Sequence, residues 1–104
     1  MSLYGALYSL VTGRSSKWPA VRRAHLKANP KCVVTGQPAT DVHHIKPFHV
    51  APSLELEPTN LASMTRDAHF IVGHNGNWKK WSLNFWYVVK SMNDSVRGPV
   101  GDAS

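Results

Sequence analysis

Hydrophobic and polar residues recur with different periods along the chain, and each change of period predicts a new secondary-structure element. Residues 2–12 are mostly apolar and stop at Gly13, which predicts a first helix. A second helix should run over residues 16–30, because Ser16 can cap its start and Pro30 ends it. Its inner face should carry Trp18, Val21 and His25, with Pro19 tolerated in its first turn.

The middle of the chain predicts two short strands and a helix. Residues 41–45, DVHHI, have the β-branched character of a strand, and residues 60–64, NLASM, predict a second strand antiparallel to it. Three prolines make residues 46–58 an irregular loop. Residues 65–76 then predict a helix that stops near Gly76.

The last predicted element is an amphipathic helix over residues 77–92, whose apolar residues recur at steps of three and four. Such an aromatic stripe is far more often core than ligand site, so we expect it to pack inward. The stripe comprises Trp78, Trp81, Phe85, Val88 or Val89, and Met92. Residues 93–104 should form a frayed tail. These elements predict one α+β domain over residues 1–104, with its core within residues 16–92.

Charge and cysteine content narrow the classes of function. Residues 1–40 contain six basic residues and no acid, which equals the net charge of +6 of all 104 residues. This one-sided segment suits a polyanion such as DNA or RNA, although a solvated basic helix explains the charge equally well. The candidate phosphate contacts are Lys17, Arg22, Arg23, Lys27 and Lys31. Since Cys32 is the only cysteine, neither an intramolecular disulfide nor a cysteine-rich zinc site can be built from this chain.

No apolar run approaches the roughly 20 residues that span a bilayer. The charges near the start follow the apolar residues instead of preceding them, which is the reverse of a signal peptide. We therefore expect no membrane contact and a cytoplasmic protein.

Histidines are the most informative residues. His43 and His44 are neighbours in a predicted strand, so their side chains should point to opposite faces. A lone histidine on an apolar face is usually a core residue, but His69 and His74 follow on the next helix. If the chain folds as strand, loop, strand and helix, His43 and His69 come close enough to bind one divalent metal. We expect His49 to border this site or to lie on the surface, and His25 to serve packing.

The order histidine pair, asparagine, histidine resembles the HNH endonucleases, which carry a ββα-metal finger. The segment VHHIKP resembles the first strand of that family, PTNLASM its asparagine and second strand, and HFIVGH its metal-binding helix. The resemblance covers roughly residues 16–82, and the flanking segments are similar to those of phage and prophage HNH proteins. It implies metal-dependent cleavage or nicking of DNA, in the host cytoplasm if the protein is phage-encoded.

The resemblance also implies roles for individual residues. His43 would bind the metal and His44 would be the general base, because the leaving oxygen and the attacking water lie on opposite sides of the phosphate. Asn60 would fix the loop and help to hold the base, although a plain turn cap is the alternative. His69 would be the second ligand. His74 lies about 140° further round an ideal helix and would bind only if the last turn loosens.

The expected cofactor is one divalent metal, Mg²⁺ or Mn²⁺ first, with Zn²⁺ or Ni²⁺ as alternatives. Many HNH proteins also carry two zinc knuckles, which would fall at residues 32 and 35 and at residues 65 and 68. Only Cys32 could bind there as a thiolate, so we expect no structural zinc and expect the C-terminal helix to pack against Trp18 instead.

The expected partner is duplex DNA, contacted mostly through its phosphates, with no module for reading sequence. Two other functions remain open. One is a catalytically inert nucleic-acid-binding protein that acts in phage DNA packaging or a larger assembly. The other is a structural module whose histidines bind zinc for stability. The sequence leaves the oligomeric state undetermined.

Overall fold

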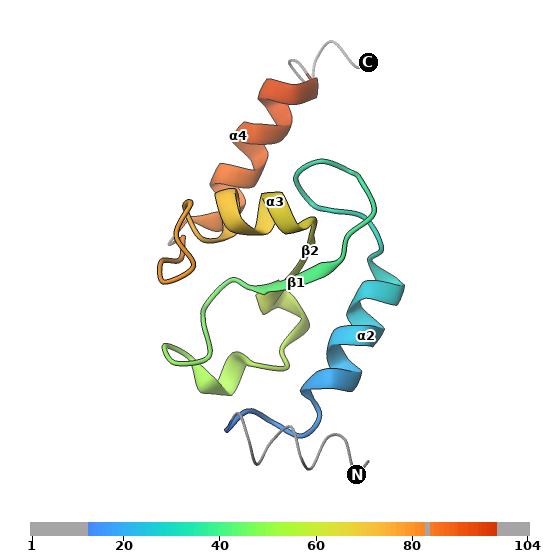
Figure 1. Cartoon of the computed structure of the whole chain (residues 1–104), viewed down its shortest axis with the longest axis vertical. Coiled ribbons are helices and arrows are strands. Elements are labelled where there is room, and N and C mark those ends of the chain that lie inside the picture. The colour runs from blue at the N-terminus through green and yellow to red at the C-terminus, as the bar shows by residue number, and fades with distance from the viewer. Residues whose placement is uncertain (1–12, 83, 98–104) are drawn as a thin grey trace.

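A two-stranded antiparallel sheet lies at the centre of the computed structural model, which describes residues 13–82 and 84–97. Helix α2 lies on one side of the sheet, and helices α3 and α4 lie on the other (Figure 1). This arrangement confirms the α+β class. The helix predicted for residues 2–12 lies outside the described residues. No helix in the described part of the chain is long and apolar enough to cross a membrane.

Helix α2 spans Trp18–Ala28 and carries Pro19 in its first turn, as predicted. The prediction that Ser16 caps it was wrong, because Lys17 occupies the N-cap and no side chain caps the helix. The hydroxyl of Ser15 instead accepts a hydrogen bond from the Lys17 N–H at 3.1 Å. At the other end, the N–H of Asn29 donates to the His25 carbonyl at 2.8 Å, just before Pro30.

The strands confirm the predicted antiparallel pair, and each is one residue shorter than expected. Strand β1 spans Asp41–His44 and β2 spans Leu61–Met64, with Asp41 opposite Met64 and His44 opposite Leu61. The loop between them has only two short 3₁₀ turns, η1 at Pro52–Leu54 and η2 at Pro58–Asn60, each with a proline in its first turn.

The helical segment after β2 has an unusual second half. Helix α3, Arg66–Ala68, begins where the Thr65 hydroxyl accepts a hydrogen bond from the Ala68 N–H at 3.2 Å. It passes into a π-helical turn, η3, at His69–Gly73. The turn ends where the N–H of His74 donates to the His69 carbonyl at 3.1 Å, an i→i+5 bond. The segment predicted as one helix over residues 65–76 is thus α-helical only in part.

Helix α4 spans Phe85–Arg97, so the prediction of a helix over residues 77–92 was wrong at its start and at its end. Turn hydrogen bonds replace helical ones before it: the Asn77 side chain accepts from the Lys79 N–H at 2.9 Å, and the Lys80 N–H donates to the Asn77 carbonyl at 2.8 Å. Residues 93–97, expected to be frayed, are helical, and residues 98–104 lie outside the described residues.

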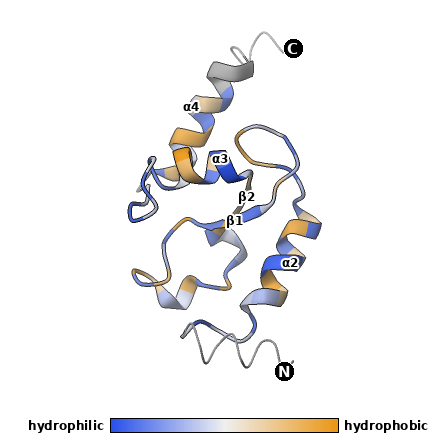
Figure 2. Ribbon diagram, viewed as in Figure 1, coloured by the Kyte–Doolittle hydropathy of each residue, from blue (hydrophilic) through white to orange (hydrophobic). Residues whose placement is uncertain are grey.

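The core has two parts, one on each face of the sheet. On the α4 side, Phe85 and Val89 pack with apolar residues of β2, α3 and η3, as the predicted stripe requires. Other members of the stripe do not pack this way: Trp78 and Met92 are 43% and 37% exposed. Figure 2 shows the hydrophobic residues of α2 and α4 interleaved with hydrophilic ones.

The second cluster contains Trp18, Val42 and Leu61 on the α2 side. The expectation that the C-terminal helix packs against Trp18 was therefore wrong, since the sheet lies between them. Helix α4 instead packs on the cluster that contains Cys32 and Ala68, and the Cys32 Sγ lies 3.9 Å from the Thr65 hydroxyl. Apolar packing thus fills the place where the resemblance would put zinc knuckles.

Candidate metal centre and histidine cavity

Strand β1 sends its two histidines to opposite faces of the sheet. His43 is only 1% exposed and lies on the α4 side, with its ring centroid 5.1 Å from that of Phe85. His44 lies on the α2 side, with its ring 4.3 Å from that of Trp18. This confirms the alternation expected of strand neighbours.

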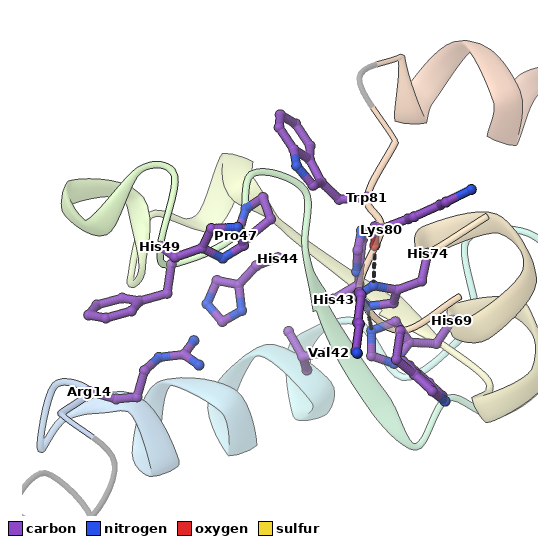
Figure 3. A pocket seen from close by; sticks show the side chains of 13 residues that line it. Arg14, Val42, His43, His44, Pro47, His49, His69, His74, Lys80 and Trp81 are labelled. Carbon is purple, nitrogen blue, oxygen red and sulfur yellow. Dashed lines mark hydrogen bonds between the residues drawn. The ribbon is translucent and has the colours of Figure 1, made fainter. Parts of the chain in front are cut away.

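Three histidines converge on the α4 side. One ring nitrogen each of His43, His69 and His74 lie within 4.8 Å of one another. The Nε2 atoms of His69 and His74 are 3.1 Å apart (Figure 3). An ideal α-helix would turn these two residues about 140° apart. The π-helical turn η3 widens the backbone loop between them and places both rings on one face.

The outer nitrogens of two of these rings have fixed partners. The Nδ1 of His69 donates to the Asp41 carboxylate at 2.9 Å, and the Nδ1 of His74 donates to the Lys80 carbonyl at 2.7 Å. Each neutral ring then presents a lone pair at Nε2. The Nε2 of His43 is buried without a hydrogen-bond partner in the described part of the chain. Lone pairs facing one another repel, and a shared cation removes that repulsion.

The donor set fits a transition metal. Two nitrogens on one tetrahedral zinc ion lie about 3.3 Å apart at a Zn–N distance of about 2.0–2.1 Å. The 3.1 Å between the two Nε2 atoms is close to that spacing. Imidazole suits Zn²⁺ and Ni²⁺, whereas Mg²⁺ takes oxygen ligands. Three histidines with an open fourth position are one known form of a catalytic zinc site.

Burial keeps the rings of His43 and His69 in the form that binds metal. Burial, together with the charges of the neighbouring histidines, lowers the pKa of His43 to about 3. Burial also lowers the pKa of His69, although the Asp41 carboxylate partly opposes this shift. Both rings are therefore neutral near pH 7, as a metal ligand must be.

Asp41 is held as an anion by several donors. Burial alone would raise its pKa, but hydrogen bonds from His69, Arg66 and Thr40 outweigh burial and hold the pKa below its usual range. The Arg66 guanidinium lies 3.1 Å from the carboxylate and 4.4 Å from the centre of the Trp78 ring. A carboxylate behind a ligating histidine fixes the ring and raises its basicity.

Gly73 makes room for the cluster. A Cβ atom at this position would lie 3.1 Å from the His43 ring and 3.2 Å from the His69 ring, closer than most side chains tolerate. Any larger residue would displace one of the two imidazoles. Gly73 therefore belongs to the site because of the close approach of its backbone.

His44 has the geometry of a base. Its Nε2 lies 2.9 Å from the Glu55 carbonyl, which can only accept, so Nε2 carries the proton and Nδ1 keeps its lone pair. Burial lowers the pKa of His44, and the hydrogen bond to the Glu55 carbonyl opposes this only partly. The Glu55 side chain is itself buried and accepts from Arg14 at 3.0 Å and from the Ser15 N–H at 3.1 Å.

Asn60 ties together both ends of the loop that carries the Glu55 carbonyl. Its Oδ1 accepts from the Lys46 N–H at 2.8 Å, and its Nδ2 donates to the carbonyls of Lys46 at 3.1 Å and Leu54 at 3.2 Å. Asn60 is thus more than a local turn cap. Asn60 does not line the cavity described next, so it can affect the cavity only through the loop that it holds.

His43 and His44 both line one cavity of about 480 Å³, called here the histidine cavity. Its lining comes from Arg14, from within residues 42–49 and from within residues 69–81. Because it reaches both faces of β1, it must pass round the edge of that strand. His43, His69 and His74 gather at one side of it, and His44 points towards Arg14 and Pro47 (Figure 3). His49 also lines the cavity and is exposed.

None of the five predicted phosphate contacts lines the histidine cavity. They are Lys17, Arg22, Arg23, Lys27 and Lys31, of which Arg22 is half-buried and the other four are exposed. The Arg22 guanidinium donates to the Thr40 carbonyl at 2.7 Å. His25, which we expected to serve packing, lies half-buried and away from this cavity, and burial lowers its pKa.

Sequence reasoning missed several residues of the site. Asp41 lies two residues before His43 and therefore on the same face of β1, so the period of the strand could have identified it. The roles of Gly73 and of the Lys80 carbonyl depend on the backbone path and have no such signal.

Comparisons with protein-family models, with curated proteins and with solved structures match nothing to this chain.

Proposed function

We propose that this protein is a metal-dependent endonuclease that hydrolyses phosphodiester bonds of DNA with a ββα-metal finger of the HNH type. One observation carries the proposal. Neighbouring residues of β1 reach a single cavity from opposite faces, one within a cluster of three histidines and the other with an Nδ1 that bonds to no residue in the described part of the chain. In-line displacement at phosphorus needs groups on two sides of the phosphate, which this placement supplies.

His43, His69 and His74 would hold one divalent metal ion, which when bound supplies positive charge to the phosphate and its leaving oxygen. Their all-imidazole donor set favours Zn²⁺ or Ni²⁺ over the Mg²⁺ that the resemblance put first. Asp41 and the Lys80 carbonyl would orient two of the three rings through their Nδ1–H groups.

His44 would take the proton of the attacking water at Nδ1. Its lowered pKa keeps the ring neutral and able to accept a proton near pH 7. The Glu55 carbonyl fixes the tautomer, and Asn60 fixes the loop that carries this carbonyl. Asn60 is thus a positioning residue in this proposal.

The exposed cations of α2 would hold the DNA by its phosphates at a distance from the cavity. This use of the basic segment agrees with the net charge of +6. Such contacts position the nucleic acid without reading its sequence. The proposal therefore includes no sequence-specific recognition.

Nicking of supercoiled plasmid tests the proposal. Protein stripped by a strong chelator should leave the plasmid intact, and separate additions of Zn²⁺, Ni²⁺, Mn²⁺ and Mg²⁺ should restore nicking with at least one ion. Plasmid binding without nicking under any ion would favour the inert binding protein. Metal binding without plasmid binding or nicking would favour the structural zinc module.

A further inference from the structure

The walls of the histidine cavity carry aromatic rings and cations that the proposed chemistry does not use. Phe48 and Trp81 both line the cavity. Lys79 and Lys80 are exposed beside Trp81, and Arg14 lies beside Phe48. Rings alternating with cations are typical of surfaces that bind single-stranded nucleic acid.

Trp81 and Phe48 differ from the third aromatic residue of the lining. Trp78 is already engaged, with Arg66 4.4 Å from its ring centre and the rings of His69 and Phe70 about 5 Å away. Trp81 is half-buried and its indole meets no other aromatic ring within residues 13–82 and 84–97. Phe48 is half-buried and forms no ring–ring contact with another described residue, and the Arg14 guanidinium lies 4.8 Å from its ring centre. These two rings keep faces on which a planar group can stack.

The depth of the cavity also bears on the substrate. His43, on the side of the cavity where the proposed metal would bind, is 1% exposed, so a phosphate must enter to approach it. The volume of about 480 Å³ lies within the range of small-ligand pockets, roughly 300–1,000 Å³. A regular duplex holds its bases stacked inside and cannot place one against Trp81. An unpaired nucleotide can turn its base outwards.

We infer that the histidine cavity receives an unpaired nucleotide, so that the substrate is single-stranded or locally unpaired nucleic acid. This inference rests on the proposed nuclease function and names its substrate class. The bases next to the scissile phosphate stack on Trp81 and Phe48, and Lys79 and Lys80 contact the flanking phosphates. Binding is tolerant of sequence, because every base has a face that can stack.

The test measures affinity by fluorescence anisotropy with chelator-treated protein, so that nothing is cut. One sequence is offered as a single strand, as a perfect duplex and as a duplex with unpaired bases at its centre. The single strand and the interrupted duplex should bind more tightly than the perfect duplex. Trp81→Ala should weaken single-strand binding about 5- to 150-fold, the value of one stacked base. Trp81→Phe should recover most of that loss.

The matched control is Trp86→Ala, which removes a 51% exposed indole of α4 that does not line the histidine cavity. It should leave all three affinities unchanged. Equal binding of the single strand and the perfect duplex would overturn the inference. So would a loss with Trp86→Ala as large as that with Trp81→Ala.

Failure of this inference can be told apart from failure of the proposed function. A protein that binds single strands through Trp81 but cuts nothing with any metal refutes the nuclease and leaves the binding surface standing. A protein that cuts a perfect duplex at the same rate with and without Trp81 refutes the substrate class and leaves the nuclease standing.

Discussion

Replacing Asp41 with asparagine tests how the hydrogen-bond partner of the His69 Nδ1 affects the proposed metal centre. The Asp41 carboxylate accepts from the His69 Nδ1 at 2.9 Å and is held by Arg66 at 3.1 Å. Asparagine has nearly the same shape, and its amide oxygen can still accept from Nδ1. The change therefore removes the negative charge and retains the possibility of a hydrogen bond.

The expected loss follows from that charge. Removing the carboxylate behind a ligating histidine typically weakens metal binding by about 10- to 100-fold. This corresponds to about 1.4–2.7 kcal/mol of binding free energy. We expect a loss in this range for Zn²⁺, because His69 is half-buried and the Asp41 side chain is only 14% exposed.

Isothermal calorimetry of Zn²⁺ binding to Asp41→Asn supplies the measurement, with circular dichroism to verify the fold. Asp67→Asn is the matched control, since Asp67 is an exposed acid on α3 and forms no bond to the histidines. It should change the affinity by less than about twofold. If both variants bind Zn²⁺ as tightly as the unaltered protein, His69 is not a ligand oriented by Asp41, and the reasoning about outer partners fails.

Three further predictions concern packing, protonation and charge. Gly73→Ala should weaken Zn²⁺ binding in the same calorimetric assay, because the added Cβ would lie 3.1–3.2 Å from the His43 and His69 rings. An unchanged Zn²⁺ affinity would show that the two rings can shift freely. The unfolded chain takes up a proton at His43 near pH 6.5 and the folded protein only near pH 3, so the metal-free protein should lose stability as the pH falls. His43 alone should lower the free energy of unfolding by about 2 kcal/mol between pH 7 and pH 5, as measured by urea unfolding, and equal stability at both pH values would contradict its burial as a neutral ring. The double change Arg22→Ala and Arg23→Ala should make the slope of log affinity against log salt shallower by up to about 1.8 for duplex DNA if both residues contact phosphates, and an unchanged slope would mean that neither does.

The strands and the placing of the histidine pair could be predicted from the sequence because their causes are local. β-Branched residues between turn segments indicated β1 and β2, and the two-residue period of a strand placed His43 and His44 on opposite faces. The same period places Asp41 on the same face of β1 as His43, so this hydrogen-bond partner of His69 could also have been found.

Periodicity failed where the backbone departs from ideal geometry. On an ideal α-helix His74 would lie about 140° from His69, and the π-helical turn η3 brings the two together. The three-and-four spacing of Trp78 and Trp81 suggested a helix, but Asn77 forms a turn and both rings serve the cavity instead of the core. Aromatic spacing alone could not separate these two outcomes.

Other features of the site have no signature in the sequence. The carbonyls of Glu55 and Lys80 hold His44 and His74, and any residue type could supply them. They depend on the path of two loops, which is set by long-range bonds such as those of Asn60. The division of the core into two clusters likewise depends on which side of the sheet each helix covers.

The central claim is that neighbouring histidines of β1 divide the chemistry between them, and one comparison of variants tests it most directly. His44→Ala and His43→Ala should be assayed together for Zn²⁺ binding by calorimetry and for plasmid nicking, with His25→Ala as a histidine control outside the cavity. His44→Ala should abolish nicking and leave Zn²⁺ affinity nearly unchanged, whereas His43→Ala should weaken both. Nicking that survives His44→Ala, or a loss of Zn²⁺ affinity with His44→Ala as large as that with His43→Ala, would contradict the account.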